Sequence, residues 1–220
     1  MWFPVKTPKA IRGLFPQYIW SINTDKKELY LTFDDGPTPE ITPWVLEQLK
    51  QYNAKATFFC IGNNIEKHPK IFEAIIKDGH SIGNHTYHHL NGWKNKTSKY
   101  IGDVSKCRDI INSKIVNQNS GIRTLFRPPY GKLKPSQSKR LRELGYNIVM
   151  WDVLSYDWET SISDVQCYHN VVNASANGSI VVFHDSVKAY KNLKLVLPKV
   201  LEYYKERGFV FQSLTRQTLE

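Results

Sequence analysis

Two adjacent carboxylates, Asp34 and Asp35, follow the apolar run Glu28–Phe33 and precede Gly36. A carboxylate at the end of a buried strand is costly to desolvate unless a metal ion or a charged partner compensates it. Successive side chains of a strand point to opposite faces, so one carboxylate can bind a cation while the other faces a reacting group. Most Asp-Asp-Gly triplets are turns, so the pair becomes informative only together with other polar side chains.

Three histidines, His85, His88 and His89, follow later in the chain and are candidate metal ligands. A helical turn would place the imidazoles of His85 and His89 on one face, and it would serve His85 and His88 equally well. Two histidines and one carboxylate leave coordination positions open on a metal, which is typical of catalytic rather than structural sites. From the residues alone, His88 and His89 remain alternatives for the third ligand.

The hydrophobic pattern indicates which elements position these groups. Short apolar runs alternate with amphipathic segments, as expected for buried strands joined by helices of a parallel sheet. The runs are Glu28–Phe33, Ala56–Ile61, His80–Gly83, Thr124–Phe126, Asn147–Val153, Ser179–His184 and Phe209–Leu214. Polar clusters follow five of these seven runs. This favours a barrel, in which the strand ends meet at one mouth, over an open sheet with a single switch point.

Length and composition are those of one globular domain. The chain has 220 residues, of which 41% are hydrophobic and 23% are charged, enough for one core and short for two domains. It lacks a membrane-spanning apolar run and a secretory signal pattern, so the chain as given predicts a cytoplasmic or membrane-peripheral protein. The three cysteines form no Cys-x-x-Cys pair, which argues against a disulfide framework.

The net charge of +10 is concentrated in residues 94–142, which hold thirteen Lys or Arg and two acids. Such a surplus indicates either an anionic partner or a set of solvated helix faces. We favour solvated faces, because the basic residues are spread over several expected helices and loops. Peripheral contact of this region with an anionic surface stays open, whereas no nucleic-acid partner is expected because no binding motif for one occurs.

Residues 1–27 interleave aromatic and basic side chains and are interrupted by Pro4, Pro8 and Pro16. The prolines argue against one continuous amphipathic helix lying on a membrane. We therefore predict an N-terminal extension, residues 1–27, that packs across the bottom of the barrel. The catalytic domain would comprise residues 28–220.

Five motifs occur in the order found in the polysaccharide deacetylase family (the NodB homology domain, carbohydrate esterase family 4). They are Thr32–Pro37, His85–His89, Arg127–Gly131, Asp157–Trp158 and Ser179–Asp185. The chain resembles this family over these motifs, with Val182 where the family more often has Leu. The resemblance implies a single-domain α/β fold, a distorted (β/α)7 barrel. It also implies hydrolysis of the N-acetyl amide of N-acetylhexosamine residues in a chitin- or peptidoglycan-like glycan.

The resemblance also implies a metal site. The family pattern His-Ser/Thr-x-x-His selects His89 over His88, so the implied ligands are Asp35, His85 and His89. One divalent ion is expected, with Zn²⁺ preferred, although Co²⁺, Ni²⁺ or Mn²⁺ also suit two histidines and a carboxylate. A Lewis-acid metal polarises an amide carbonyl and lowers the pKa of water.

Proton transfer would involve four further residues of the family motifs. Asp34 would be the general base that takes a proton from water, and Arg127 would orient it and keep it ionised. His184 would be the general acid that protonates the leaving amine. Asp157 would pair with His184 and raise its pKa, although Asp152 and Asp185 are close enough in sequence to compete.

The resemblance also implies two residues that would line the substrate pocket. The backbone N–H of Tyr130 would stabilise the developing oxyanion, and Trp158 would form an apolar wall. Core packing is an equally good explanation of Trp158. A different amidohydrolase, acting on a small non-sugar amide, formamide or ureide, would keep the same metal ligands on the same barrel.

Overall fold

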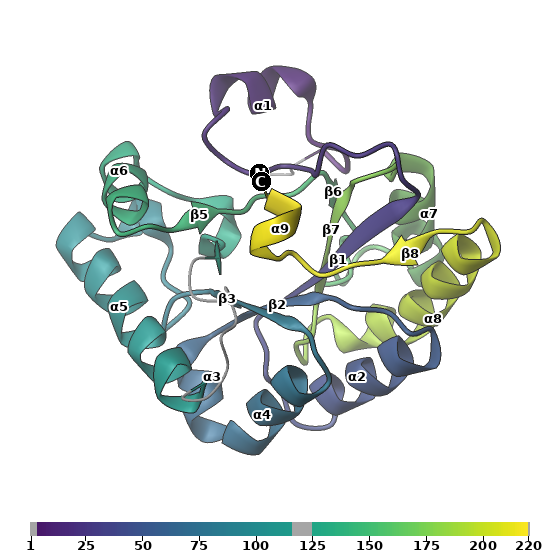
Figure 1. The fold of residues 1–220 in the computed structure, drawn as a ribbon, viewed down its shortest axis with the longest axis horizontal. Coiled ribbons are helices and arrows are strands. Elements are labelled where there is room, and N and C mark those ends of the chain that lie inside the picture. Colours follow the sequence, from purple (N-terminus) through teal and green to yellow (C-terminus); the bar gives the residue numbers. More distant parts are fainter. Residues whose placement is uncertain (1–3, 116–124, 220) are drawn as a thin grey trace.

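The computed structural model describes residues 4–115 and 125–219 (Figure 1). The strands are β1 (Glu28–Asp34), β2 (Thr57–Cys60), β3 (Ser81–Asn84), β4 (Leu125–Phe126), β5 (Asn147–Ile148), β6 (Val153–Leu154), β7 (Ile180–His184) and β8 (Val210–Phe211). The helices are α1 (Lys9–Leu14), α2 (Ile41–Gln51), α3 (Gly62–Lys67), α4 (Pro69–Lys77), α5 (Thr97–Lys114), α6 (Pro135–Glu143), α7 (Asp164–Ala174), α8 (Tyr190–Glu206) and α9 (Arg216–Leu219), with 3-10 turns η1 (Gly92–Lys94) and η3 (Pro129–Gly131). Thr124, the first residue of the fourth predicted run, lies outside the described residues.

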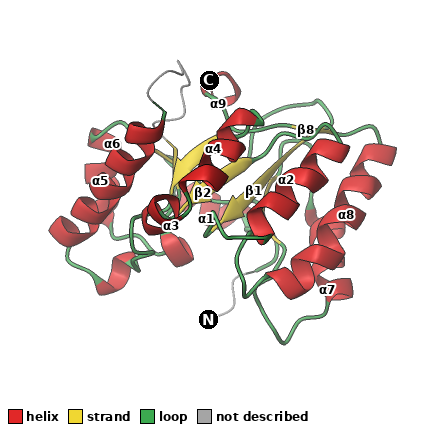
Figure 2. Ribbon diagram, turned by 90° about the horizontal axis from the view of Figure 1, so that it is seen from below, coloured by secondary structure: helices red, strands yellow, loops and turns green. Residues whose placement is uncertain are grey.

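The strands pair in parallel in the order β5-β4-β3-β2-β1-β7-β6, with β8 beside β1. The sheet curls, and the helices form a ring around it (Figure 1) that covers its outer face (Figure 2). The predicted single-domain α/β barrel is therefore confirmed in an incomplete form. Its edge strands, β5 and β6, do not pair with each other among the described residues.

The predicted run Asn147–Val153 is wrong as one strand, because the chain changes partners within it. The N–H of Val149 donates to Phe126 O in β4 at 2.8 Å, whereas the N–H of Asp152 donates to Ile180 O in β7 at 3.0 Å. Crossing between opposite edges of the sheet separates β5 from β6. We call the open side of the barrel between these two strands the seam.

The N-terminal segment, residues 4–22, fills the seam with backbone hydrogen bonds. The N–H of Met150 donates to Ile19 O at 2.7 Å, that of Ile19 to Ile148 O at 2.9 Å, and that of Leu154 to Val5 O at 2.9 Å. Helix α1 lies beside β5 and β6 in Figure 1. The segment thus runs along the open side of the barrel rather than only across its bottom, and the domain boundary at residue 28 stays a prediction.

Buried aromatic packing fixes the direction of the strand ends. The rings of Phe58 and Phe183 stack on Phe33 with centroids 5.1 and 5.9 Å away, and all three side chains are buried. Each such ring stabilises the fold by roughly 1.5–3 kcal/mol. Because strand side chains alternate, burial of Phe33 and Phe183 on the helix-covered face turns Asp34 and His184 to the opposite face.

The cysteine prediction is confirmed, since Cys60, Cys107 and Cys167 are free and buried. Over the described ranges, no helix has both the length and the apolar character needed to cross a membrane.

Candidate active site

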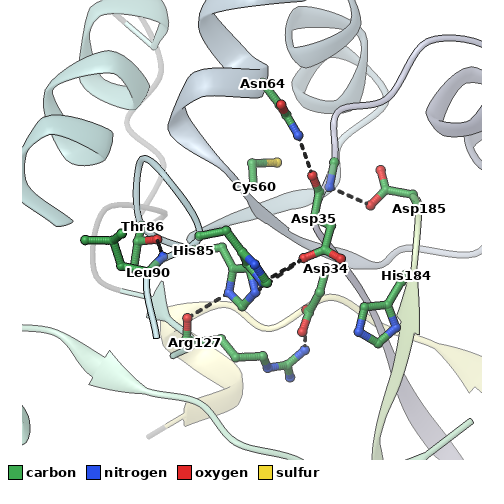
Figure 3. Close-up of polar contacts among 12 residues, drawn as sticks. Asp34, Asp35, Cys60, Asn64, His85, Thr86, Leu90, Arg127, His184 and Asp185 are labelled. Atoms are coloured by element: carbon green, nitrogen blue, oxygen red, sulfur yellow. Dashed lines mark hydrogen bonds and ion pairs between the residues drawn. The ribbon is translucent and has the colours of Figure 1, made fainter. Parts of the chain in front are cut away.

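The polar clusters meet at the carboxyl ends of the strands, as predicted for a barrel. Asp34 ends β1 directly opposite His184 of β7 in the register. His85 follows β3, and Arg127 follows β4. Figure 3 shows these side chains and Asp35 pointing toward one another from different strands.

Three side chains form a candidate metal centre. One ligand atom from each of Asp35, His85 and His89 lies within 4.8 Å of the other two. Oδ1 of Asp35 lies 3.7 Å from Nε2 of His85 and 3.2 Å from Nε2 of His89. This oxygen is buried yet has no hydrogen-bond partner among the described residues. An unpartnered buried carboxylate oxygen facing two imidazole nitrogens is the arrangement that a divalent cation would satisfy.

The protonation of these ligands suits a metal. Nδ1 of His85 lies 2.8 Å from Arg127 O, and since a carbonyl only accepts, Nδ1 carries the proton and Nε2 presents its lone pair to Asp35. Burial lowers the pKa of His85 to about 4, so its imidazole is neutral at pH 7. Burial would raise the pKa of Asp35, but the imidazoles of His89 and His184 hold it well below its usual range.

The helical turn expected for His85–His89 is wrong. The segment that follows β3 is an irregular loop in which Thr86 and His89 adopt φ of 64° and 55°. The two imidazoles still meet, with ring centroids 5.2 Å apart. His88 instead turns away, with 57% of its side chain exposed and Nδ1 2.6 Å from Asp103 Oδ1.

Asp103 of α5 is the partner that shapes this loop. Its Oδ2 accepts the N–H of Tyr87 at 2.8 Å and the N–H of His88 at 2.9 Å. Oδ1 of the same carboxylate binds the His88 imidazole. The hydroxyl of Thr86 in turn accepts the N–H of Leu90 at 3.0 Å. The loop between the two histidine ligands is therefore held by hydrogen bonds rather than by helix geometry.

Asp34 forms an ion pair with the buried guanidinium of Arg127. Nη1 of Arg127 donates to Asp34 Oδ1 at 2.7 Å and to Thr32 Oγ1 at 2.7 Å. The guanidinium is completely buried and also donates to the carbonyls of Val149 at 3.3 Å and Met150 at 2.8 Å. Because these carbonyls fix the guanidinium, one oxygen of Asp34 is committed to it and the other is left to the pocket.

His184 is paired with Asp157, and neither competitor replaces it. Nδ1 of His184 lies 2.9 Å from Asp157 Oδ1, and its backbone N–H donates to Oδ2 at 2.8 Å. Burial alone would lower the pKa of His184, but the Asp157 carboxylate raises it to about 9. Asp152 binds Lys6 and Ser179 at the seam. Asp185 accepts the Gly36 N–H at 3.0 Å.

The active-site pocket has a volume of about 380 Å³ and is lined by Asp34, Asp35, His184, Tyr130 and Trp158 among others. The Tyr130 ring packs on His89 with centroids 4.5 Å apart, and the Tyr130 backbone has a φ of 60°. The Trp158 indole meets His184 edge-on at 4.6 Å. Trp158 thus lines the pocket and also packs against the core, where it stacks on Tyr156.

Three residues that position the site were not identified as such from the sequence. Asp103 holds the histidine loop, Asp185 holds Gly36, and Asn64 Nδ2 donates to Asp35 O at 2.8 Å. The sequence could have indicated Asp103, because it is one of the two acids in the basic region 94–142. In the structure its side chain is buried. Asp185 also had a signal, because it ends the motif Ser179–Asp185, whereas the spacing of Asn64 carries none.

Comparison with known proteins gives the same family. The polysaccharide deacetylase family model matches residues 21–149. A peptidoglycan-N-acetylglucosamine deacetylase of Bacillus cereus is 38% identical over 90% of this chain and 70% of its own length. A peptidoglycan-N-acetylmuramic acid deacetylase of Bacillus subtilis is 28% identical over 96% of this chain and 80% of its own length.

The fold agrees with that of a solved relative. A crystal structure of a peptidoglycan N-acetylglucosamine deacetylase superposes with a TM-score of 0.82 at 37% identity and covers 90% of this chain and 91% of the other. The residues matched by the family model include β1 to β5, and these strands lead to Asp34, His85 and Arg127. The chain therefore belongs to the polysaccharide deacetylase family.

Proposed function

We propose that the protein is a peptidoglycan-type N-deacetylase, which hydrolyses the acetamide of N-acetylglucosamine or N-acetylmuramic acid residues and releases acetate. One observation carries the proposal: three metal-binding side chains, an Arg-held carboxylate and a carboxylate-paired histidine converge on one pocket. Amide hydrolysis needs a polarised carbonyl, a base and an acid. Relatives named for both sugars support a glycan substrate and give no support to a small non-sugar amide.

The donor set Asp35, His85 and His89 fits one divalent ion, for which Zn²⁺ is our first choice and Co²⁺, Ni²⁺ and Mn²⁺ are alternatives. The unpartnered Oδ1 of Asp35 supports a cation at this point. When bound, such an ion supplies Lewis-acid polarisation of the acetyl carbonyl and acidifies water. The neutral imidazole of His85 is already in the protonation state that a ligand requires.

In the proposed mechanism, Asp34 takes the proton of the attacking water. Arg127 occupies one of its oxygens, which leaves the second oxygen as the base. The geometry supports this assignment because Arg127 is fixed by two backbone carbonyls and cannot turn away. The ion pair with the Arg127 guanidinium also offsets the cost of burying Asp34.

His184 is proposed to donate a proton to the nitrogen as the carbon–nitrogen bond breaks, so that a sugar amine and acetate leave. Asp157 holds Nδ1, which leaves Nε2 for the substrate. A pKa of about 9 keeps this imidazole protonated at neutral pH before the bond breaks. The pairing with Asp157 and the raised pKa therefore both support His184 as the acid rather than as a second base.

Tyr130 and Trp158 are proposed to complete the pocket. The backbone N–H of Tyr130 would stabilise the oxyanion, and its left-handed backbone supports a functional role, since such strain costs about 1–3 kcal/mol and clusters at active sites. The Trp158 indole would confine the acetyl methyl group against His184.

The test is an acetate-release assay on chelated protein supplied separately with Zn²⁺, Co²⁺, Ni²⁺ or Mn²⁺. The panel comprises peptidoglycan fragments, N-acetylglucosamine oligomers, small cyclic amides and formamides. We expect acetate from the N-acetylated glycans and no turnover of the small amides. Absence of acetate from every glycan with all four metals would rule the proposal out.

Contact of the basic region 94–142 with an anionic surface stays a prediction. Several described basic side chains have local partners, since Arg127 binds Asp34, Lys134 Nζ donates to Asn95 O at 2.8 Å, and Arg140 pairs with Glu143. Residues 116–124 of the region lie outside the described residues. If the region binds an anionic glycan, added salt should lower activity on that glycan but not on a neutral oligomer.

A further inference from the structure

A second cavity of about 190 Å³ lies at the seam, beside the larger active-site pocket. We call it the seam pocket. It is lined by the N-terminal segment and by loops that follow β3, β4 and β5, chiefly through Phe15, Tyr18, Trp20, Trp93, Leu133 and Trp151. Five of its eleven lining residues are aromatic, and none of the roles proposed for catalysis uses them.

The seam pocket adjoins the active-site pocket. Gly131 and Trp151 line both cavities. A Cβ at Gly131 would lie 2.5 Å from Trp151 Cη2, and φ at Gly131 is +64°. A side chain at position 131 would therefore clash with Trp151. Because glycine has none, the loop after β4 packs directly against the indole that lies between the two cavities.

Trp93 is a fixed and accessible aromatic surface at this cavity. Its side chain is 54% exposed, although large apolar side chains are usually buried. Its indole Nε1 donates to Leu133 O at 3.3 Å, and its backbone N–H donates to Asn91 Oδ1 at 3.0 Å. Lys132 Nζ lies 5.3 Å from the ring centroid. A preoriented ring beside a hydrogen-bond donor binds a ligand at low entropic cost.

The N-terminal segment supplies the opposite wall. The Phe15 and Tyr18 rings stack with centroids 5.6 Å apart and an interplanar angle of 3°. Phe15 is 41% exposed. The hydroxyl of Thr7 donates to Trp151 O at 2.9 Å and ties the segment to the wall shared by the two pockets. The seam thus presents flat rings from two separate parts of the chain.

We infer that the seam pocket is a distal glycan subsite, which binds a further sugar of the chain whose acetamide lies in the active-site pocket; this inference rests on the proposed function. Because Gly131 and Trp151 line both cavities, the two lie side by side, which favours one linear ligand that reaches both. Aromatic faces pack against the C–H face of a sugar ring, while the Lys132 ammonium at the rim can donate to hydroxyl or carboxylate oxygens. An acyl chain could use that charge only through a terminal carboxylate, whereas a sugar offers hydroxyl oxygens around its ring.

The subsite is tested by calorimetric binding of N-acetylglucosamine disaccharide and hexasaccharide to the full chain, in wild type, Trp93→Ala and Phe15→Ala. Only the hexasaccharide is long enough to fill both pockets with sugars to spare. We expect the ratio of hexasaccharide to disaccharide affinity to fall about tenfold in both variants, as for loss of one aromatic stacking contact. Trp93→Phe should restore most of the ratio, because it keeps a flat ring.

The matched control is Leu195→Ala, which removes a 45% exposed apolar side chain from α8. It should leave the ratio unchanged, and thermal unfolding of each variant verifies folding. An unchanged ratio in Trp93→Ala or Phe15→Ala, or binding of laurate but not of the hexasaccharide, would overturn the subsite. Since binding is measured without turnover, this result is independent of acetate release, whose absence would count against the proposed function instead.

Discussion

The opening of the barrel at the carboxyl ends of its strands, which we call the active-site mouth, and the seam each bury carboxylates beside cationic groups. They differ in whether every carboxylate oxygen has a partner. At the seam, Asp152 Oδ1 pairs with Arg12, and Oδ2 binds Lys6 and Ser179. At the mouth, Arg127 takes one oxygen of Asp34, while Oδ1 of Asp35 has no hydrogen-bond partner among the described residues. A satisfied carboxylate stabilises the fold, whereas one left partly unsatisfied is available to a metal or a proton.

The backbone shows the same contrast. Non-glycine residues with positive φ gather around the mouth, at Asp35, Thr86, His89, Tyr130 and Tyr156. In the described N-terminal segment, no non-glycine residue has a positive φ. Local strain is therefore concentrated where the proposed chemistry takes place and is absent from the element that completes the barrel wall.

The largest effect is expected for His89→Ala, which removes a proposed ligand from the mouth. Metal affinity should fall roughly 100-fold or more, because even outer partners of metal ligands are worth about 10–100-fold. Metal content after dialysis and acetate release both report the change. His88→Ala is the matched control, since His88 turns to Asp103. Equal metal content in His89→Ala and wild type would show that the third ligand is another residue.

Asp34→Asn tests whether the base and the metal ligand are different carboxylates. The amide keeps the shape of the side chain but cannot accept the water proton, so kcat should fall on the order of 10²–10⁴-fold. Metal content should stay at the wild-type value, because Asp35 is the carboxylate proposed as ligand. Loss of metal together with activity would mean that the two carboxylates are not divided between these roles.

Asp103→Ala tests whether the histidine loop is positioned from α5. The N–H groups of Tyr87 and His88 lose their acceptor, so the loop that carries His89 loosens. We expect metal affinity to weaken about 10–100-fold while the protein stays folded. Asp109→Ala is the control, since Asp109 is an exposed acid on the same helix, beside Arg108. Similar metal affinities for the two variants would remove Asp103 from the site.

Asp157→Asn should shift the pH dependence of kcat/KM. The proposed mechanism needs the acid form of His184, so activity should fall as pH rises through a pKa that Asp157 raises to about 9. Without that charge the pKa drops, and the alkaline limb should move about one unit or more toward lower pH. Asp164→Asn, a surface change beside Lys199, should leave the limb in place. An unmoved limb in Asp157→Asn would assign it to another group.

The strand ends that meet at the mouth were predictable from the sequence, because each polar cluster follows an apolar run. The positions of Asp34, His85, Arg127 and His184 follow from that pattern and from parallel topology. The geometry of the histidine loop was not predictable. A spacing of four fits a helix equally well, and the loop conformation depends on Asp103, which lies far along the chain.

The seam was not predictable for a related reason. Residues 147–153 read as one apolar strand because both of its partners are apolar strands, so hydrophobicity does not record the change from β4 to β7. Ile19 and Val5 pair through backbone atoms, which leave no side-chain pattern. Long-range pairing of this kind is visible only once the sheet order is known.

The smallest effect on chemistry, and a distinct effect on stability, is expected for Asp152→Asn. The amide keeps one acceptor oxygen but carries no charge, so Lys6 and Arg12 lose their ion pairs and Ser179 loses a charge-assisted hydrogen bond. We expect a loss of about 1–3 kcal/mol in unfolding free energy, less than for a fully buried pair because Lys6 is 47% exposed and can turn to solvent. Thermal and denaturant unfolding measure it, while kcat/KM on the disaccharide should match wild type. A loss of kcat/KM at unchanged stability would contradict the contrast between the two carboxylates and place the seam within the catalytic apparatus.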